Sequence, residues 1–292
     1  MACPCELRLG GDERKAVNHI AQKCISEARR FEKKYSRYLD ASITSQINSA
    51  AGERAIAVDP ETSAILQYAG VCYAQSQGMF DITSGVLRRI WNSARKELPG
   101  ERELRECIDL IGWAKVELSK NTVFLPKKGM ELDFGGVVKE YAVDAITLMA
   151  QSNGIAHGLV NLGGDIGVIG PDMEGKPWSI GVVNPGKRET AIATIQLYKG
   201  AVATSGAYER HFEIDGKKYS HLINPKTGWP VESLQSVTVA ADTAIVAGSI
   251  SSIALLNDAS ESLSWLENCG AAYFAIDREL QCYGHLAGNG AD

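Results

Sequence analysis

The sequence predicts an α+β fold in which mostly antiparallel sheets are flanked by helices. Three observations support this prediction. Many short segments alternate apolar and polar residues or are rich in β-branched residues, as strands are. Several longer segments place apolar residues three and four positions apart, as amphipathic helices do. Asp215-Gly216 lies between two alternating segments, which is typical of the turn of an antiparallel hairpin.

The helices are predicted from apolar periodicity and from residues that begin and end helices. Residues 12–35 carry a single apolar stripe. Asp59-Pro60 provides an N-cap and a first-turn proline for a helix that Gly78 ends. Further helices are predicted at 87–91, 101–110, 139–153, 243–257 and 258–268. Because residues 243–257 carry almost no charge, we expect that helix to be buried.

The strands are predicted between these helices, without an internal repeat or an obvious linker. We therefore expect one domain over residues 1–292, or two interleaved subdomains within it. The predicted strands are 115–119, 121–126, 130–136, 158–164, 166–170, 178–184, 193–199, 201–206, 211–216, 217–224, 235–241 and 271–277.

Composition and charge exclude some classes of protein. The chain is 45% apolar and 22% charged, which is typical of a soluble globular protein, and its net charge of −5 argues against nucleic-acid binding. We predict no membrane span. The seven cysteines are odd in number and scattered, so free thiols are favoured over a disulfide framework. We expect a cytoplasmic protein, or a periplasmic or membrane-anchored one if a leader has been removed.

Two glycine pairs follow apolar segments predicted as strands. In Leu132-Asp133-Phe134-Gly135-Gly136-Val137-Val138-Lys139 the pair precedes a helix, whose free N–H groups favour an anion, and Lys139 adds a positive charge. The second pair is Gly163-Gly164 in Asn161–Asp165. Each pair alone is typical of a tight turn, and neither matches a dinucleotide fingerprint or a P-loop. Together they indicate a cleft large enough for a nucleotide.

Two further segments carry polar side chains beyond what packing requires. In Phe80-Asp81-Ile82-Thr83-Ser84-Gly85 the polar residues either cap the following helix or contact a ligand. Thr204 and Ser205 precede a hairpin that returns through His221. One interpretation is Ser–His nucleophilic catalysis, another is a histidine that takes a proton from an incoming hydroxyl, and a third is a structural histidine bonded to the turn.

The ordered set of these motifs resembles the ApbE family, the FAD:protein FMN transferases. The resemblance begins with Ser36-Arg37-Tyr38, Ser42, Asn48 and Gly52. It continues through the segments 80–87 with Trp91, 132–144, 159–166, 203–230 and 236–256.

The resemblance implies an enzyme that binds FAD and magnesium. Such an enzyme moves FMN onto a Thr or Ser hydroxyl of an acceptor protein through a phosphoester bond and releases AMP. It implies that His221 is the proton acceptor, with Thr204 and Ser205 beside it. It implies FAD contacts at Phe80, Asp81, Thr83, Gly135, Gly136, Lys139, Asp144, Gly163, Gly164, Ser205, Tyr208 and Arg210.

The chain departs from the family pattern at the metal site. The family's magnesium ligands are an Asp, a Thr four residues later and a backbone carbonyl; here these positions are Gly248, Ser252 and Gly136. The glycine that usually follows the family's lysine is Glu140. Two hypotheses follow: a transferase that recruits its metal through Glu140, Asp165, Asp242 or the phosphates, or a protein that binds FAD without transferring it.

Overall fold

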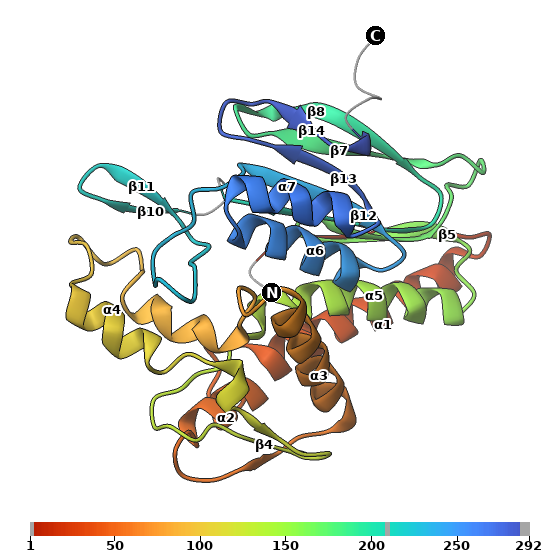
Figure 1. Cartoon of the computed structure of the whole chain (residues 1–292). Coiled ribbons are helices and arrows are strands. Elements are labelled where there is room, and N and C mark those ends of the chain that lie inside the picture. The colour runs from red at the N-terminus through yellow and green to blue at the C-terminus, as the bar shows by residue number, and fades with distance from the viewer. Residues whose placement is uncertain (1–2, 208–210, 287–292) are drawn as a thin grey trace.

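The computed structural model describes residues 3–207 and 211–286, and its centre is a seven-stranded sheet (Figure 1). Each pair of neighbouring strands in this sheet is antiparallel. The strands, in spatial order, are β1 (Cys5–Gly10), β5 (His157–Leu162), β6 (Asp165–Gly170), β9 (Gly200–Gly206), β12 (Ser236–Ala241), β13 (Ala272–Ile276) and β14 (Cys282–Tyr283). The predicted fold class is confirmed.

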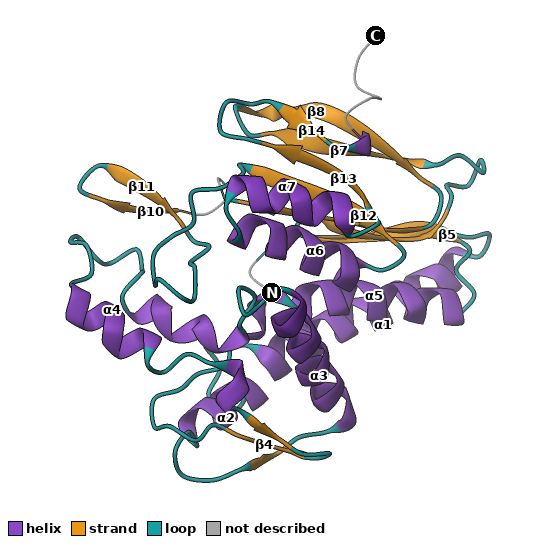
Figure 2. Cartoon of the chain, in the orientation of Figure 1, coloured by secondary structure: helices purple, strands orange, loops and turns teal. Residues whose placement is uncertain are grey.

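Helices cover one face of this sheet, and a β-ribbon covers the other (Figure 2). α5 (Val138–Ser152) packs on β5 and β6, and α6 (Ala244–Leu256) packs on β9 and β12. α1 (Arg14–Tyr35) packs on α5, and α7 (Ala259–Asn268) packs on α6.

Strand β9 shows how side chains divide between the two faces. Ala203 belongs to the apolar core beneath α6, whereas Val202 belongs to the core shared with the ribbon β7 (Trp178–Asn184) and β8 (Lys187–Leu197). Successive side chains of a strand point to opposite faces. Odd-numbered residues of β9 therefore face the helices.

The remaining elements surround the segments that precede α5. Helix α3 begins at Pro60, where Asp59 accepts a hydrogen bond from Thr62 N, as predicted. These elements are α2 (Ile43–Ser49), β2 (Ile56–Ala57), α3 (Pro60–Gln75), the 3₁₀ helix η1 (Ile82–Arg89), α4 (Glu101–Ile108), the 3₁₀ helix η2 (Trp113–Lys115), β3 (Glu117–Leu118), β4 (Thr122–Phe124) and the 3₁₀ helix η3 (Phe134–Gly136). β2, β4 and β3 form a small sheet of their own.

A second hairpin, β10 (His211–Ile214) and β11 (Lys217–Ser220), extends beside α4 (Figure 1). Ile214 pairs with Lys217, and Asp215 and Gly216 have positive φ, so the predicted Asp-Gly turn is confirmed. The chain after β11 is held by Trp91, which is fully buried and donates from Nε1 to the Gly228 carbonyl at 2.7 Å.

Several local predictions differ from the structure. Residues 130–136 do not form a strand, because their backbone is bound by side chains and then enters η3. The helix expected at 87–91 begins earlier, at Ile82, and is a 3₁₀ helix. β1 and α2 were not predicted. Among residues 3–207 and 211–286, no helix combines the length and apolar character needed to cross a bilayer.

Replacing Trp91 with Phe tests whether its hydrogen bond fixes the segment after β11. The change keeps an aromatic ring but leaves the buried Gly228 carbonyl without its donor, so we expect the free energy of unfolding to fall by about 1–3 kcal/mol. Urea unfolding measures this loss. Trp229→Phe is the control, because that ring is 39% exposed; an equal loss in both variants would contradict the assigned role.

Candidate functional site

The first glycine pair forms a solvent-exposed loop that leads into α5. Gly135 and Gly136 belong to η3 and are exposed. Asp133 caps this turn, because its Oδ1 accepts a hydrogen bond from Gly135 N at 2.9 Å. The ring of Phe80 lies behind Gly136, where an added Cβ would come within 3.4 Å of it. The glycine backbone therefore faces solvent in front and an aromatic ring behind.

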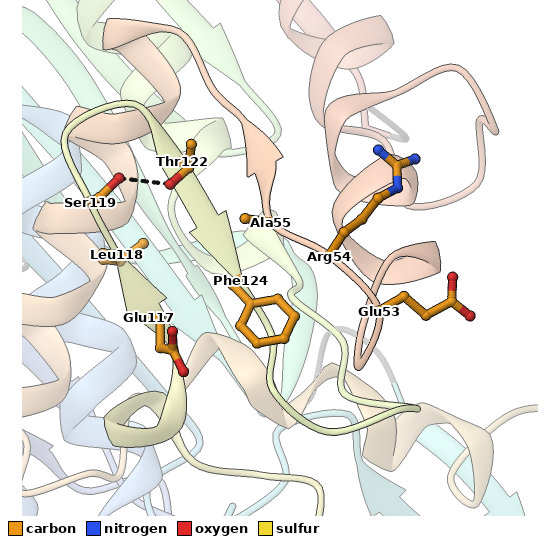
Figure 3. Close-up of a pocket in the computed structure, with 8 residues that line it drawn as sticks. All are labelled: Glu53, Arg54, Ala55, Glu117, Leu118, Ser119, Thr122 and Phe124. Carbon is orange, nitrogen blue, oxygen red and sulfur yellow. Dashed lines mark hydrogen bonds between the residues drawn. The ribbon is translucent and has the colours of Figure 1, made fainter.

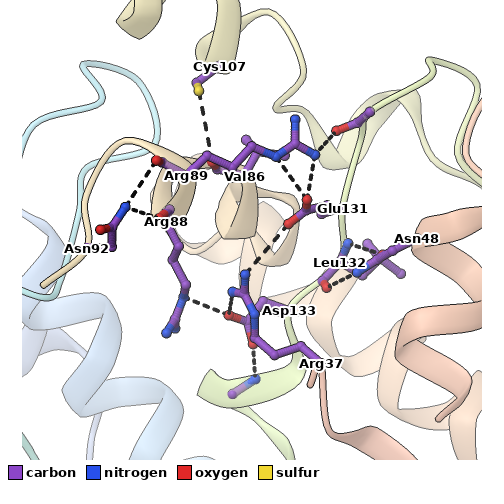
Figure 4. Close-up of polar contacts among 12 residues, drawn as sticks. Arg37, Asn48, Val86, Arg88, Arg89, Asn92, Cys107, Glu131, Leu132 and Asp133 are labelled. Carbon is purple, nitrogen blue, oxygen red and sulfur yellow. Dashed lines mark hydrogen bonds and ion pairs between the residues drawn. The ribbon is translucent and has the colours of Figure 1, made fainter. Parts of the chain in front are cut away.

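Polar side chains from distant segments hold the strand-like segment before this loop (Figure 4). Asn48 donates to the Leu132 carbonyl at 3.0 Å and accepts from Leu132 N at 2.7 Å. Arg37 and Arg88 each lie 2.9 Å from Oδ2 of Asp133. Because the Asn48 side chain binds both backbone groups of Leu132, this segment is fixed without belonging to a sheet.

The second glycine pair is the two-residue turn between β5 and β6. Gly163 and Gly164 have φ of +64° and +96°, which favour glycine, and Leu162 pairs directly with Asp165. Asn161 Oδ1 accepts from Gly164 N at 2.9 Å. Gly164 is exposed, and a Cβ there would meet nothing within 4 Å. This turn therefore also presents bare backbone to solvent.

An ion pair joins the two glycine turns. Lys139, in the first turn of α5, contacts Oδ2 of Asp165, which follows Gly164 directly. Burial by itself would lower the pKa of Lys139, but the carboxylates of Glu140 and Asp165 outweigh burial and raise it. Lys139 therefore stays charged. Its side chain remains 28% exposed, so it lies at the boundary between the protein and the exposed glycines.

Glu140 is a buried carboxylate beside this ion pair. Its relative exposure is 6%, and its Oε1 lies 3.9 Å from Lys139 Nζ. Burial, followed by the nearby charge of Asp165, raises the pKa of Glu140. Within the described part of the chain, its Oε2 has no hydrogen-bond partner. The side chain lies against Gly248 of α6, where an added Cβ would come within 2.5 Å of Glu140 Cγ.

Hydroxyl groups of α6 and β9 meet beside Gly248. Ser205 Oγ lies 2.9 Å from Ser251 Oγ and 3.1 Å from Ser252 Oγ. Ser251 also donates to the Gly248 carbonyl at 3.0 Å. The structure thus brings together two residues of the predicted site, Ser205 and Ser252.

Thr204 lies on the other face of β9. Its hydroxyl is 2.9 Å from that of Thr238, its partner on β12. Adjacent residues of a strand point to opposite faces, and Ser205 faces α6. The hydroxyls of Thr204 and Ser205 therefore lie on opposite faces of β9, and a catalytic role for both beside His221 stays a prediction.

The polar residues of the 80–85 segment cap local turns. Asp81 Oδ1 accepts from Thr83 N at 2.8 Å, and Asp81 Oδ2 accepts from Trp113 N at 3.0 Å. Thr83 Oγ1 accepts from Gly112 N at 2.8 Å. Asp81 and Thr83 are 7% and 0% exposed. Of the two interpretations that the sequence left open, capping fits these contacts.

Asp144 caps a helix. Its two carboxylate oxygens accept from Ala244 N at 2.7 Å and Ile245 N at 2.9 Å, at the start of α6. Burial raises the pKa of Asp144 against the opposing effect of these two hydrogen bonds. The contacts attach α6 to α5, and the expected contact of Asp144 with FAD stays a prediction.

His221 directly follows β11 and begins the segment that Trp91 holds. The next residue, Leu222, packs against the apolar cluster that contains Ala203 of β9 and Ala247 of α6. This packing places the predicted proton acceptor at the side of the molecule where β9 meets α6. Tyr208 and Arg210 lie outside the described residues.

Two surface pockets lie elsewhere. One, of about 330 Å³, lies at the small sheet, with the Phe124 ring at its centre (Figure 3). The other lies between α1 and the end of α5. No predicted site residue lines either pocket. Among residues 3–207 and 211–286, no three His, Cys, Asp or Glu side chains are grouped as a metal site, and all seven cysteines are free.

The sequence profile of the ApbE family matches residues 1–274. The chain belongs to the ApbE family. A relative from Klebsiella pneumoniae (strain 342), named FAD:protein FMN transferase, is 29% identical over 226 residues, which are 75% of this chain and 70% of that protein. The protein of the same name from Escherichia coli K12 is 35% identical over 185 residues, 60% of this chain and 52% of that protein. The match therefore spans about half of the E. coli relative.

Solved ApbE structures have the same fold. The ApbE protein of Thermotoga maritima MSB8 superposes with a TM-score of 0.87 at 28% identity, over 96% of this chain and 97% of that chain. The flavin transferase ApbE from Vibrio cholerae has a TM-score of 0.84 at 22% identity, over 98% and 95% of the two chains. At that identity the second likeness concerns the fold alone. The family predicted from the motifs is confirmed.

Replacing Asp144 with Ala tests its role as a cap for an ApbE helix. The change leaves two N–H groups at the start of α6 without an acceptor, so we expect unfolding to become easier by about 1–2 kcal/mol. Urea unfolding provides the measurement, and Asp242→Ala, an exposed carboxylate two residues before α6, is the control. A loss no larger than that of the control would show that the cap contributes little.

Proposed function

We propose that this chain is an FAD:protein FMN transferase that moves FMN from FAD onto a Thr or Ser hydroxyl of an acceptor protein. The observation that best supports this proposal is the Lys139–Asp165 ion pair, which joins two exposed glycine turns in a chain of the ApbE family. The names of the relatives support the same reaction. The paired turns provide a place where a diphosphate meets bare backbone and a cation.

The diphosphate is proposed to bind across the two glycine turns. The N-terminus of α5 follows Gly136 directly, so its free N–H groups and helix dipole favour negative charge there. Lys139 adds a cation on the same side. Arg88 adds another, because its Nη2 lies 4.0 Å from the position of a Cβ on Gly135 and its side chain is 46% exposed. These groups together would offset the charge of the phosphates.

The proposed reaction is an in-line phosphoryl transfer. The acceptor hydroxyl oxygen forms a bond to the phosphorus of the FMN half, and the bond from that phosphorus to the oxygen bridging to AMP breaks. AMP leaves with the bonding electron pair, and His221 takes the hydroxyl proton. Most of the catalysis would come from positioning and charge neutralisation.

Magnesium is the cofactor that the family resemblance implies. The Gly136 carbonyl and the Ser252 hydroxyl are neutral, and alone they fit Mg²⁺ poorly, because this ion favours charged oxygens. The buried Glu140 carboxylate lies against the same helix as Ser252, so the donor types present together fit a divalent cation. Such an ion, when bound, would neutralise phosphate charge during transfer.

One observation favours a second candidate function. Gly248 stands where the family pattern has a metal-binding Asp, and no three-residue acidic or histidine group is found among the described residues. A protein that binds FAD without a working metal site would hold flavin but not transfer it.

The transferase proposal also requires a partner, which is an acceptor protein that carries the Thr or Ser to be flavinylated.

A direct transfer assay separates the two functions. The protein is incubated with FAD, MgCl₂ and a flavinylation-competent acceptor of this family, and the acceptor is then analysed by mass spectrometry. We expect a mass increase equal to one FMN group together with release of AMP. Bound FAD with an unchanged acceptor mass at high MgCl₂ would favour the carrier, and failure to bind FAD would refute both.

Replacing His221 with Ala should abolish transfer but not FAD binding. Loss of a general base costs about 10²–10⁴-fold in rate, whereas the proposed diphosphate contacts lie on other residues. The rate comes from the acceptor mass assay and FAD binding from quenching of flavin fluorescence. Transfer at the wild-type rate would refute the assignment of His221 as proton acceptor.

Replacing Arg88 with Met should weaken FAD binding by about two- to fivefold, because a half-exposed cation next to Gly135 contributes modestly. Arg89→Met is a matched control: Arg89 is 44% exposed and pairs with Glu131. Fluorescence titration at two salt concentrations gives the affinities. Equal weakening in both variants would attribute the effect to net charge and not to Arg88.

A further inference from the structure

Glu140 fills the space that a side chain on Gly248 would occupy. A Cβ built on Gly248 lies 2.5 Å from Glu140 Cγ and 3.2 Å from both Cδ and Oε1. Contacts this short do not occur between real Cβ atoms and their neighbours, so a side chain on Gly248 would force Glu140 out of its present conformation. The carboxyl group of α5 therefore lies at the surface of α6 where an Asp at position 248 would begin.

The position of this carboxyl group relative to Ser252 follows from helix geometry. Residues four apart lie on the same face of a helix, with their Cβ atoms about 5–6 Å apart. Ser252 thus lies one turn beyond Gly248, on the face that Glu140 contacts. Its hydroxyl is partly buried and meets Ser205 Oγ at 3.1 Å.

The carboxylate lacks a partner for one oxygen. The relative exposure of Glu140 is 6%, so the residue is more than nine-tenths buried. Its Oε2 accepts no hydrogen bond among the described residues. An unpaired buried carboxylate oxygen is costly, and a bound ion is one partner that would satisfy it. Lys139 is shared: it contacts Asp165 closely and lies 3.9 Å from Glu140 Oε1. One cation thus faces two carboxyl groups, and the charge of Asp165 opposes ionisation of Glu140.

We propose that Glu140 of α5, whose side chain occupies the space that Gly248 leaves open on α6, is the carboxylate ligand of a divalent cation. The Ser252 hydroxyl and the Gly136 carbonyl are the neighbouring oxygen donors, and the FAD phosphates and water complete the coordination. One or two carboxylates with substrate phosphates and water are the usual ligands of Mg²⁺. This inference rests on the proposed function, since FAD supplies part of the site.

The test measures Mg²⁺ affinity directly. Mg²⁺ is titrated into FAD-loaded protein without acceptor by isothermal calorimetry, and a titration into FAD alone is subtracted. Glu140→Gln keeps the shape of the side chain and removes its charge. We expect its Mg²⁺ affinity to fall by about tenfold or more, with FAD still bound. Asp258→Asn, an exposed carboxylate just beyond the other end of α6, should bind Mg²⁺ as the wild type does.

A carboxylate exchange provides the second measurement. Glu140→Gly should lose Mg²⁺ affinity, and the double variant Glu140→Gly/Gly248→Asp should recover it, because the new Asp occupies the space that Glu140 leaves. Circular dichroism and thermal unfolding identify the folded variants. A folded double variant that binds Mg²⁺ no better than Glu140→Gly would contradict the claim that carboxylates at positions 140 and 248 serve the same cation site.

The remaining outcomes separate this inference from the proposed function. If Glu140→Gln binds Mg²⁺ as tightly as the wild type, or if the FAD-loaded wild type binds none, Glu140 is not the ligand and the inference is overturned. If the wild type neither binds FAD nor modifies the acceptor, the proposed function fails first. Fluorescence quenching on the same samples distinguishes these cases.

Discussion

The site depends on the ion pair between Lys139 and Asp165. Each charged group is expensive to bury alone, so each requires the other. Lys139 follows the first glycine pair in the sequence, and Asp165 follows the second. The contact between these two residues therefore also joins the two glycine turns. The pair therefore holds the start of α5 against the β5–β6 turn, and the two exposed glycine backbones lie together as a consequence.

The same ion pair leaves Glu140 without a positively charged partner of its own among residues 3–207 and 211–286. Glu140 and Asp165 share one lysine, and burial together with their mutual repulsion acts against the charge on Glu140. A diphosphate entering such a site would add repulsion, whereas a divalent cation would attract both the phosphates and the spare carboxylate. The charges thus favour an anion and a cation bound together over either one alone, which is the pairing that phosphoryl transfer uses.

Local signals in the sequence predicted the glycine turns, the Asp59 cap, the Asp-Gly hairpin and most helices, because each depends on residues close along the chain. The roles of other residues depend on distant partners. Asp144 caps the distant helix α6, and residues 130–136 alternate like a strand although Asn48 binds their backbone. Strand β1 carries a short apolar alternation, Leu7 and Leu9, that could have indicated it. The Glu140–Gly248 contact links two helices far apart in the sequence, and no local pattern reveals it.

The two departures from the family pattern are linked by this contact. Taken separately, the glycine at 248 looks like the loss of a metal ligand, and the glutamate at 140 looks like a charge added beside a phosphate site. In the structure the Glu140 side chain occupies the space that a Cβ on residue 248 would need, so α5 brings a carboxyl group to the surface of α6 where the family's Asp would begin. A relocated carboxylate therefore accounts for both residues with one physical cause, whereas loss of function would account for Gly248 and leave the buried Glu140 unexplained.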